Sequence, residues 1–436
     1  MAAACGSSKT AAPATTATTA AATTAAATTA AATTAAATTA AKSALPTGLW
    51  DDGPCDAAKP PLKIGLQTVF ASGVLTLGDQ AKALEAAAKA FNARGGANKH
   101  CIQVTTCDDG ADPNKALNCV RTLTDAGVVA TVNDTTSVAG KDVSAAYAAA
   151  GIARFAISPG QDDYPDVNAY PFDGGGTGTS LMMPQALLDK GIKKIAIVRV
   201  DIPAATALKG FYQAVFTGKG LEVVADLPVP AGTTDYSQFI LAAQAAGAKG
   251  VAMPIGGQEG IQVLKAGQQL KADLTYSSSL GTFPLSDIAA LGDYSSRVLL
   301  NAAIPPAGFD DPVNNVLVAD LGASGVKELQ KDNMKSSPMR SWVGLYGLLY
   351  VLRQAKMDAF TKETVKAAIE ASGPIPMLGL TKDFTPKFDH PGAFKRLGNG
   401  FYAFWAYDPA SKGFKKVSEA DMDKLLCGSP VGAKTC

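Results

Sequence analysis

Hydroxyl-bearing residues crowd two short segments, Asn133-Asp134-Thr135-Thr136-Ser137 and Ser158-Pro159-Gly160-Gln161-Asp162. Hydroxyl groups and backbone amides can hold an anion or another polar group, above all where a helix begins, because the first N–H groups of a helix lack partners. Neither segment has the GxSxG context of a nucleophilic serine, and neither contains a histidine. These residue types therefore indicate binding of a small molecule rather than its chemical conversion.

The sequence offers little for catalysis or for metal binding. The histidines are His100 and His390, and neither stands in a metal-ligand spacing. The phosphate-binding motif GxxxxGK[ST] is missing, and the run from Gly174 to Gly178 is not GxGxxG because Thr179 takes the place of the last glycine. We therefore expect no enzyme, no cofactor and no metal, although a histidine within hydrogen-bond reach of a cleft serine would reopen the enzyme hypothesis.

Both hydroxyl segments follow short apolar runs that are typical of buried strands. Strands are expected at 62–68, 102–107, 128–132 and 153–157, with a helix from about 78 to 93 between the first two. Asp112 and Pro113 fit the N-cap and the first position of the next helix. Strands that alternate with helices predict a parallel sheet covered on both faces, and ligands bind beyond the carboxyl ends of such strands.

A second series of strands and helices repeats this architecture. Its strands are expected at 194–200, 222–227, 251–254, 274–277 and 297–302, with helices at 237–246 and 260–270. The glycine run Gly174–Gly178 predicts a crossing between two lobes, and Pro374, Pro376 and Pro386 mark another. The apolar helix 342–352 is too short to span a bilayer and is expected in the core, and 401–407 is expected as a late strand.

Length and charge narrow the class of protein. A chain of 436 residues is expected to form at least two domains, and a hydrophobic content of 47% is enough for real cores. The net charge of +1 argues against a nucleic-acid partner, which needs a basic surface.

The cysteine content favours an oxidising compartment. The chain has seven cysteines, none in a CxxC pair, and setting Cys5 aside leaves an even number suited to three disulfides. The pairs that we expect are Cys107 with Cys119, Cys427 with Cys436, and Cys55 with Cys101. Six unpaired, partly buried thiols are the alternative.

Residues 1–60 are predicted to form a lipoprotein leader and a stalk. Met1 to Ser8 resemble the end of a bacterial lipoprotein signal, which predicts a lipid anchor on Cys5, although Ala2 stands where leucine is commoner; a free cysteine is the alternative. Residues 21–40 repeat Ala-Ala-Thr-Thr-Ala four times and lack large apolar side chains, so we expect a disordered stalk. As a random coil, a stalk of about 50 residues would reach roughly 40 Å from the anchor.

From Leu62 to about Lys416 the chain resembles the type I periplasmic binding proteins, in particular the branched-chain amino acid receptors (Leu/Ile/Val-binding protein-like) of ABC transporters. The resemblance lies in Leu62-Lys63-Ile64-Gly65-Leu66, Phe91-Asn92-Ala93-Arg94-Gly95-Gly96, Cys107-Asp108-Asp109 with Asp112-Pro113, Gly151-Ile152, Ala156-Ile157-Ser158-Pro159 and Ile195-Ala196-Ile197-Val198. It implies an α/β fold of two doubly wound parallel-sheet lobes joined by a three-crossing hinge. Lobe 1 would be 61–173 with about 304–375, and lobe 2 would be 174–303 with about 376–436.

The resemblance also implies a function and partners. It implies an extracytoplasmic, cell-surface or periplasmic receptor, monomeric and held at the membrane by its lipid anchor alone, that passes a small ligand to the permease subunits of an ABC importer. A ligand-sensing or interaction lipoprotein of the same fold is the alternative.

Site residues follow from the same resemblance. Thr135, Thr136 and Ser137 match the loop whose hydroxyl and amides hold a ligand carboxylate, and Ser158, Gly160, Gln161 and Asp162 match the neighbouring ligand loop. Phe70, in the first strand-to-helix loop, is expected to pack against an apolar part of the ligand. The alternative is that Ser137 only caps a helix and that Ser158-Pro159 only form a turn.

Several positions depart from an amino-acid receptor, among them Ala204, which stands where an aromatic side chain often covers the ligand. Leu280 stands where the family's amine-binding acidic residue is expected, and Gly256-Gly257-Gln258 replace a tyrosine-bearing loop, which leaves Gln258 as the site residue there. An ammonium group needs a buried carboxylate because an unpaired charge is costly to bury. Either Asp162 or Glu259 could supply it; otherwise the ligand is an amide, an aromatic acid or another carboxylate.

Overall fold

The computed structural model describes residues 45–72, 76–201, 203–386 and 394–430. Its first sheet has five parallel strands in the order β2-β1-β3-β4-β5. These strands are β1 (Leu62–Thr68), β2 (Ile102–Asp108), β3 (Ala130–Val132), β4 (Ala153–Ile157) and β5 (Ala169–Pro171). Their carboxyl ends share one edge, so the loops after β3 and β4 are neighbours.

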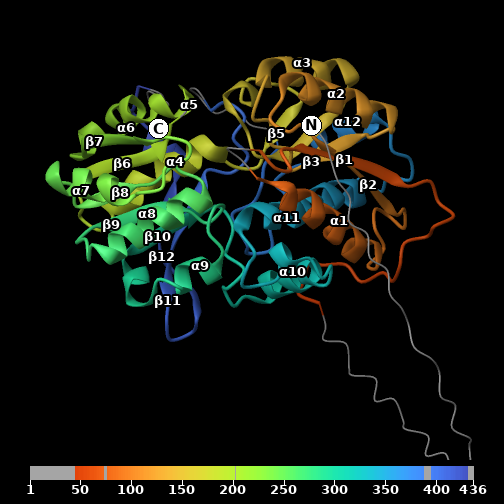
Figure 1. Cartoon of the computed structure of the whole chain (residues 1–436). Helices are drawn as coiled ribbons and strands as arrows, with labels where there is room; N and C mark the ends of the chain where they lie inside the picture. Colours follow the sequence, from red (N-terminus) through yellow and green to blue (C-terminus); the bar gives the residue numbers. More distant parts are fainter. Residues whose placement is uncertain (1–44, 73–75, 202, 387–393, 431–436) are drawn as a thin grey trace, which may run out of the picture. The chain divides into compact units, whose positions relative to one another are not determined.

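Helices cover both faces of this sheet (Figure 1). On one face lie α2 (Pro113–Asp125) and α3 (Gly140–Ala150), which enclose a small core with Val128 and Ile152. On the other face lie α1 (Gly78–Asn92), α10 (Pro312–Gly322) and α11 (Ser336–Gln354). Shorter elements are η1 (Gln161–Asp163), η4 (Lys327–Leu329) and α12 (Lys362–Ala371). Asp112 caps α2, accepting from the Asn114 and Lys115 amides, as the Asp-Pro pair predicts.

The second sheet has seven strands in the order β12-β11-β10-β9-β8-β6-β7. The strands are β6 (Lys194–Val200), β7 (Glu222–Val229), β8 (Gly250–Ala252), β9 (Thr275–Ser279), β10 (Val298–Ala302), β11 (Phe401–Asp408) and β12 (Gly413–Asp421). β6 to β10 are parallel, whereas β11 and β12 are antiparallel to their neighbours. Its helices are α4 (Gly175–Leu188), α5 (Pro203–Thr206), α6 (Leu208–Phe216), η2 (Thr217–Lys219), α7 (Ser237–Ala245), α8 (Gly257–Gln269), α9 (Leu285–Ala289), η3 (Gly292–Arg297) and α13 (Met422–Leu426).

The chain passes between the two sheets three times: after β5, after β10 and after α12. The predicted fold class, two parallel-dominated α/β lobes with three crossings, is confirmed. In the described part of the chain, no helix is both long and apolar enough to cross a membrane.

The glycine run differs from the prediction. The crossing is shorter than predicted: Gly174 lies between β5 and α4, and Gly175 to Gly178 already form the first turn of α4. Close packing explains the glycines: a Cβ on Gly178 would lie 2.6 Å from the Tyr402 Oη, and one on Gly174 would lie 2.7 Å from the Met422 Sδ. The structure also contains two strands that the sequence analysis did not predict, β5 in the first sheet and β12 in the second.

Two of the three expected disulfides are present, Cys55–Cys101 and Cys107–Cys119. Cys427 is disulfide-bonded as well, but Cys436 lies outside the described residues. Cys5 and the predicted stalk also lie outside them.

Candidate ligand-binding site

The loop after β3 carries free backbone donors. It starts at Asn133 (φ 58°) and ends at Ala139 (φ 51°), both left-handed, a conformation that alanine rarely adopts. The Thr135 amide donates to the Gln67 carbonyl over 3.1 Å, which fixes the loop to β1. Within the described residues, the N–H groups of residues 136–142, up to the first turn of α3, donate no hydrogen bond. This row of amides is suited to receive acceptor oxygens.

The loop after β4 lies against it. The Ser158 amide donates to the Asp134 carbonyl over 2.9 Å. The two loops also approach each other closely at two glycines. A Cβ added to Gly160 would lie 3.6 Å from the Thr136 carbonyl oxygen, and a Cβ added to Gly140 would lie 2.7 Å from the Asp162 Oδ2. The fold thus brings together the predicted residues of the two loops.

The individual site residues differ in what they can offer. Ser137 is exposed, and the N-cap of α3 is Ala139, without a side-chain cap, so the alternative that Ser137 only caps this helix is wrong. Ser158 is half-buried, and Gln161 and Asp162 are exposed. The Gly160 amide is not free to donate to a ligand, because it already donates to the Asp163 Oδ2 over 2.8 Å. What this glycine can contribute is space, since it has no side chain.

A buried arginine lies beneath these loops. Arg154, fully buried in β4, donates to Asp163, to the Asp134 carboxylate (3.5 Å), to the Ser144 Oγ (3.1 Å) and to the Thr136 Oγ1 (2.8 Å). Burial alone would lower the pKa of Arg154, but Asp163 and Asp134 raise it above its usual value. Burial raises the pKa of Asp134, and Arg154 opposes that shift. Sequence reasoning missed Arg154, although an arginine inside an apolar strand is itself a signal of a buried ion pair.

Phe70 lies beside the same edge. Its ring is half-buried and packs against the core of the first lobe. Its amide donates to the Asp108 Oδ1 over 2.8 Å, next to the Cys107–Cys119 disulfide.

Gln258 belongs to the other lobe. It is exposed in the first turn of α8 and lines a cavity of about 340 Å³ with Thr233, Thr234, Tyr236, Glu259 and Gln262. This cavity lies beyond the carboxyl ends of β7 and β8. In the part of the chain that the structure describes, no hydrogen bond joins Gln258 to the loops of the first lobe.

Leu280 is buried in the core of the second lobe, with 2% of its surface exposed. Its carbonyl accepts from the Ser336 amide (3.1 Å) at the start of α11. The Ser337 carbonyl in turn accepts from the Asn133 Nδ2 (3.4 Å). The start of α11 therefore connects the loop after β9 to the loop after β3.

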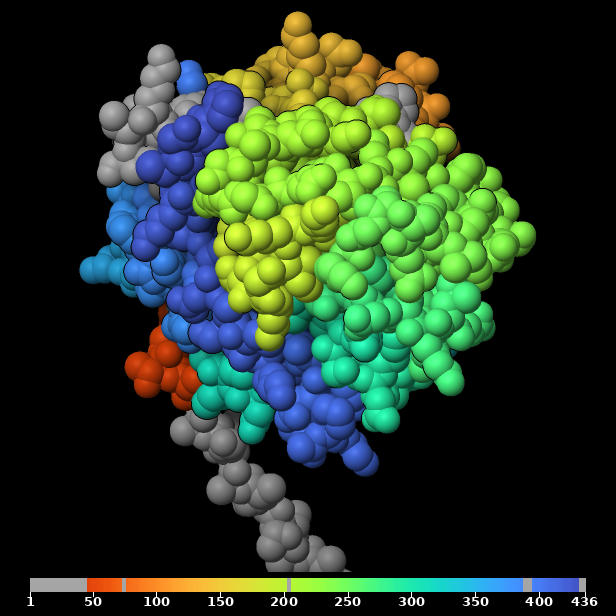
Figure 2. All heavy atoms as spheres, turned by 90° about the vertical axis from the view of Figure 1, so that its left-hand side faces the viewer, coloured from red at the N-terminus to blue at the C-terminus, as the bar shows by residue number. Residues whose placement is uncertain are grey.

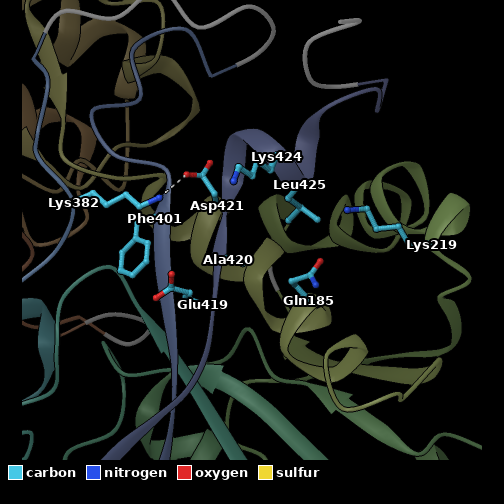
Figure 3. Close-up of a pocket in the computed structure, with 9 residues that line it drawn as sticks. All are labelled: Gln185, Lys219, Lys382, Phe401, Glu419, Ala420, Asp421, Lys424 and Leu425. Atoms are coloured by element: carbon cyan, nitrogen blue, oxygen red, sulfur yellow. Dashed lines mark ion pairs between the residues drawn. The ribbon is translucent and has the colours of Figure 1, made fainter. Parts of the chain in front are cut away.

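A second cavity, of about 300 Å³, contains none of the predicted residues. It lies between α4, β12 and α13. Figure 2 shows the blue C-terminal part of the chain alongside yellow and yellow-green residues from the middle of the sequence. Figure 3 shows Lys219, Lys382 and Lys424 around it, with Lys382 paired to Asp421 at 3.5 Å.

His100 lies away from the hydroxyl loops. It precedes β2, at the opposite end of the strands, and its Nδ1 is 2.6 Å from the Pro60 carbonyl oxygen. His390 lies outside the described residues. The structure therefore gives no described serine a histidine partner.

Comparisons with known proteins agree with this geometry. The sequence matches the family described as periplasmic binding protein over residues 61–395. It is 24% identical to Leu/Ile/Val-binding protein homolog 7 of Brucella suis over 342 residues, 72% of this chain and 82% of that protein.

Solved structures share the fold. A fatty acid ABC transporter substrate-binding protein from Thermomonospora curvata has a TM-score of 0.71 and 17% identity, covering 90% of this chain and 100% of that one. An ABC transporter solute-binding protein from R. palustris, in complex with 4-hydroxybenzoate, has a TM-score of 0.67 and 14% identity, covering 83% and 97%.

Proposed function

The chain belongs to the periplasmic binding protein family, and we propose that it captures a small polar organic ligand between its two lobes and delivers it to an ABC importer. Proteins of this family act outside the cytoplasm. The observation that carries the proposal is the row of backbone N–H groups at residues 136–142 that donate no hydrogen bond within the described residues. They lie beside the Thr136 and Ser137 hydroxyls, at the carboxyl ends of the strands of the first sheet.

The lobes are proposed as 61–173 with about 304–375, and 174–303 with about 376–436. α10, α11 and α12 accompany the first sheet, and β11 and β12 belong to the second, which supports these limits. Closure of the lobes would be a hinge motion about the three crossings. Lobe 2 would contact the ligand through Gln258. Lobe 1 would contact it through Phe70, Thr135, Thr136, Ser137, Ser158, Gly160, Gln161 and Asp162.

The ligand is proposed to be an amino acid, an amide or a carboxylate. Leu280 supplies no charge, so an amino acid would need Asp162 or Glu259 for its ammonium group. The similar proteins from R. palustris and Thermomonospora curvata, by their descriptions, bind 4-hydroxybenzoate and serve fatty acid transport. Carboxylates without an ammonium group therefore belong in any screen.

The remaining parts of the proposal concern partners. We propose a non-enzymatic monomer that meets the permease subunits of an importer and is tethered to the membrane through a lipid on Cys5. Mass spectrometry of the membrane-extracted protein tests the tether, since a diacylglyceryl group on Cys5 adds a defined mass that Cys5→Ala removes.

A thermal-shift screen against amino acids, amides, aromatic acids and other small carboxylates tests the central proposal. A ligand at about 100 times its Kd adds roughly 2.7 kcal/mol to the free energy of unfolding, which raises the Tm visibly. Ser137→Ala should weaken the response of a hit while leaving the ligand-free Tm unchanged, since Ser137 caps no helix. A well-folded protein whose Tm moves with no compound would count against a solute receptor.

A further inference from the structure

We propose that the cavity between α4, β12 and α13 is a second binding site, separate from the cleft, and that it takes the phosphate group of a phosphate monoester. The proposal goes beyond solute capture and does not depend on it, because none of the residues assigned to the captured ligand lines this cavity. Its volume of about 300 Å³ is at the lower end of the range for small-molecule sites, about 300–1,000 Å³.

Three lysines reach the cavity from separate parts of the chain. Lys219 ends η2, Lys382 lies in the third crossing, and Lys424 lies in α13. Figure 3 shows Lys219 and Lys382 on opposite sides of the cavity, and the Lys219 side chain points toward it. An anion in the cavity would therefore be approached by ammonium groups from more than one direction.

The carboxylates that line the cavity already have lysine partners. Asp421 pairs with Lys382 at 3.5 Å, and Glu419 pairs with Lys416 at 3.0 Å. The Asp421 carboxylate also caps α13, accepting from the Asp423 amide over 3.0 Å. These two acids are therefore not available to neutralise the remaining lysines of the cavity.

The ammonium groups of Lys219 and Lys424 are left for a ligand. Within the described residues, neither takes part in a hydrogen bond or an ion pair. Partial burial lowers the pKa of Lys219, and nearby Asp189 opposes that shift. The Asp189 carboxylate itself accepts from Gln185 over 2.6 Å and from Ser418 over 3.1 Å. Since burial disfavours the charged form of Lys219, an anion beside it would stabilise that form.

The residue types favour phosphate over carboxylate. Arginine is the side chain that binds a planar carboxylate through two parallel hydrogen bonds, whereas lysine binds phosphate as a point charge. Among the described residues that line the cavity, every cation is a lysine. A phosphate monoester has a second pKa of about 6, so it carries close to two negative charges at neutral pH. That charge matches the two ammonium groups without partners.

The organic part of the ester would contact an apolar wall. The half-buried Phe401 and the buried Leu425 line the same cavity. The Lys382 Nζ lies 5.4 Å from the centre of the Phe401 ring, so apolar and cationic surfaces adjoin there. An ester with a small apolar group should therefore bind more tightly than inorganic phosphate.

Two compounds of the same shape test the charge. Phenyl phosphate and phenyl sulfate differ by one negative charge at about pH 8. In titration calorimetry of the full chain carrying Cys5→Ala, phenyl phosphate should bind at least about 10-fold tighter than phenyl sulfate. Added salt should weaken its binding, because the lysines are exposed. Equal affinities, or no binding of phenyl phosphate, would overturn the proposal.

Lysine variants test the place. Lys219→Gln and Lys424→Gln should each raise the Kd of phenyl phosphate by about 5- to 20-fold. Lys219→Arg and Lys424→Arg keep the charge and should stay within about threefold of the wild type. The matched control is Lys89→Gln, an exposed lysine of α1, which should leave the Kd unchanged. A Kd that neither cavity substitution changes would place the phosphate elsewhere and overturn the proposal.

Vesicles separate two sources of the phosphate. Phosphatidic acid presents a phosphate monoester on a membrane surface, and vesicles of phosphatidylcholine alone are the control. Co-sedimentation with phosphatidic acid vesicles that Lys219→Gln/Lys424→Gln abolishes would identify a lipid head group. Binding of phenyl phosphate without co-sedimentation would identify a soluble ester.

This proposal and the receptor function can fail separately. Lys219→Gln/Lys424→Gln should leave the Kd of a hit from the thermal-shift screen within about twofold, because sites that share no residue are usually independent. If the screen finds no ligand for the cleft while phenyl phosphate binds as described, the cavity site stands and the receptor function fails. If a cleft ligand is found and phenyl phosphate does not bind, the receptor function stands and this proposal fails.

Discussion

Arg340 forms an ion pair with Asp173 and thereby joins helix α11 to the segment that leads from β5 into α4. The two side chains are 12% and 2% exposed, and the Arg340 Nη2 also donates to the Ile157 carbonyl over 3.2 Å. Asp173 in turn accepts from the Gly175 amide over 2.9 Å. A single buried pair therefore connects the first crossing, α11 and the residue that precedes Ser158.

Replacing Arg340 by methionine should strongly destabilise the protein. The Asp173 carboxylate would remain buried without its partner, which typically costs about 3–5 kcal/mol in the free energy of unfolding. Urea denaturation measures the loss. The double variant Arg340→Met/Asp173→Asn removes both charges and should recover part of it, whereas strictly additive single losses would show that the pair is not coupled.

The two glycines Gly176 and Gly178 form a matched test of the packing of α4. A Cβ on Gly178 would lie 2.6 Å from the Tyr402 Oη, so Gly178→Ala should destabilise the protein by about 1–3 kcal/mol. Gly176 in the same turn has no atom within 4 Å of that position. Gly176→Ala should therefore stabilise by up to about 1 kcal/mol through helix propensity. Equal effects in thermal or urea unfolding would mean that Tyr402 does not constrain α4.

The disulfides should differ in their contribution to stability. Cys55–Cys101 closes a separation of 46 residues and Cys107–Cys119 one of 12. By the chain-entropy relation, removing the longer loop's bridge with paired alanine substitutions should cost about 4 kcal/mol, and removing the shorter about 3 kcal/mol. Denaturation of the two double variants under non-reducing conditions measures both. A larger loss at Cys107–Cys119 would show that the loop at Asp108 depends on that bridge for more than entropy.

Asp109 should make stability fall as the pH rises. Burial raises its pKa above 3.8, although hydrogen bonds from the Ala111 amide and from Gln67 oppose this, so the folded state holds the proton more tightly than the unfolded state. This contribution to stability is complete below the unfolded pKa and is lost as the pH rises through the folded pKa.

Comparison with Asp109→Asn isolates this contribution, because the amide does not titrate. The free energy of unfolding of the wild type, relative to that of the variant, should decline as the pH rises from below 3.8. Urea titrations at a series of pH values measure it. If the free energy of unfolding of the wild type instead rose relative to that of the variant over this pH range, the hydrogen bonds to Asp109 would lower its pKa by more than burial raises it.

The regular elements were largely predictable from local patterns. β1, β4 and β6 lie where apolar runs predict them, and Asp112-Pro113 open α2 as their residue types require. β12 was missed because Gly413–Asp421 is mostly polar, as suits a strand at the sheet edge. The turn Gly175–Gly178 was predicted to be part of a crossing because glycine absorbs large backbone changes, and the close approach of Tyr402 to Gly178 is a tertiary contact without a local signal.

The candidate site was predictable only in part. The positions of Thr135, Thr136 and Ser158 after strands followed from the strand pattern, and the fold places these loops side by side. The role of Arg154 did not follow, because its partners Asp134 and Asp163 come from two different loops. An arginine inside an apolar strand signals a buried ion pair, but the identity of its partners is a property of the tertiary structure.

The Cys55–Cys101 bridge has a mechanical consequence. It ties the segment ahead of β1 to the residue just before β2, the edge strand of the first sheet. A pull on the chain ahead of Cys55 passes through a covalent bond to Cys101 and bypasses residues 56–100, which include β1. Tension from that side would then act first on β2, and β1 would not be peeled from the sheet.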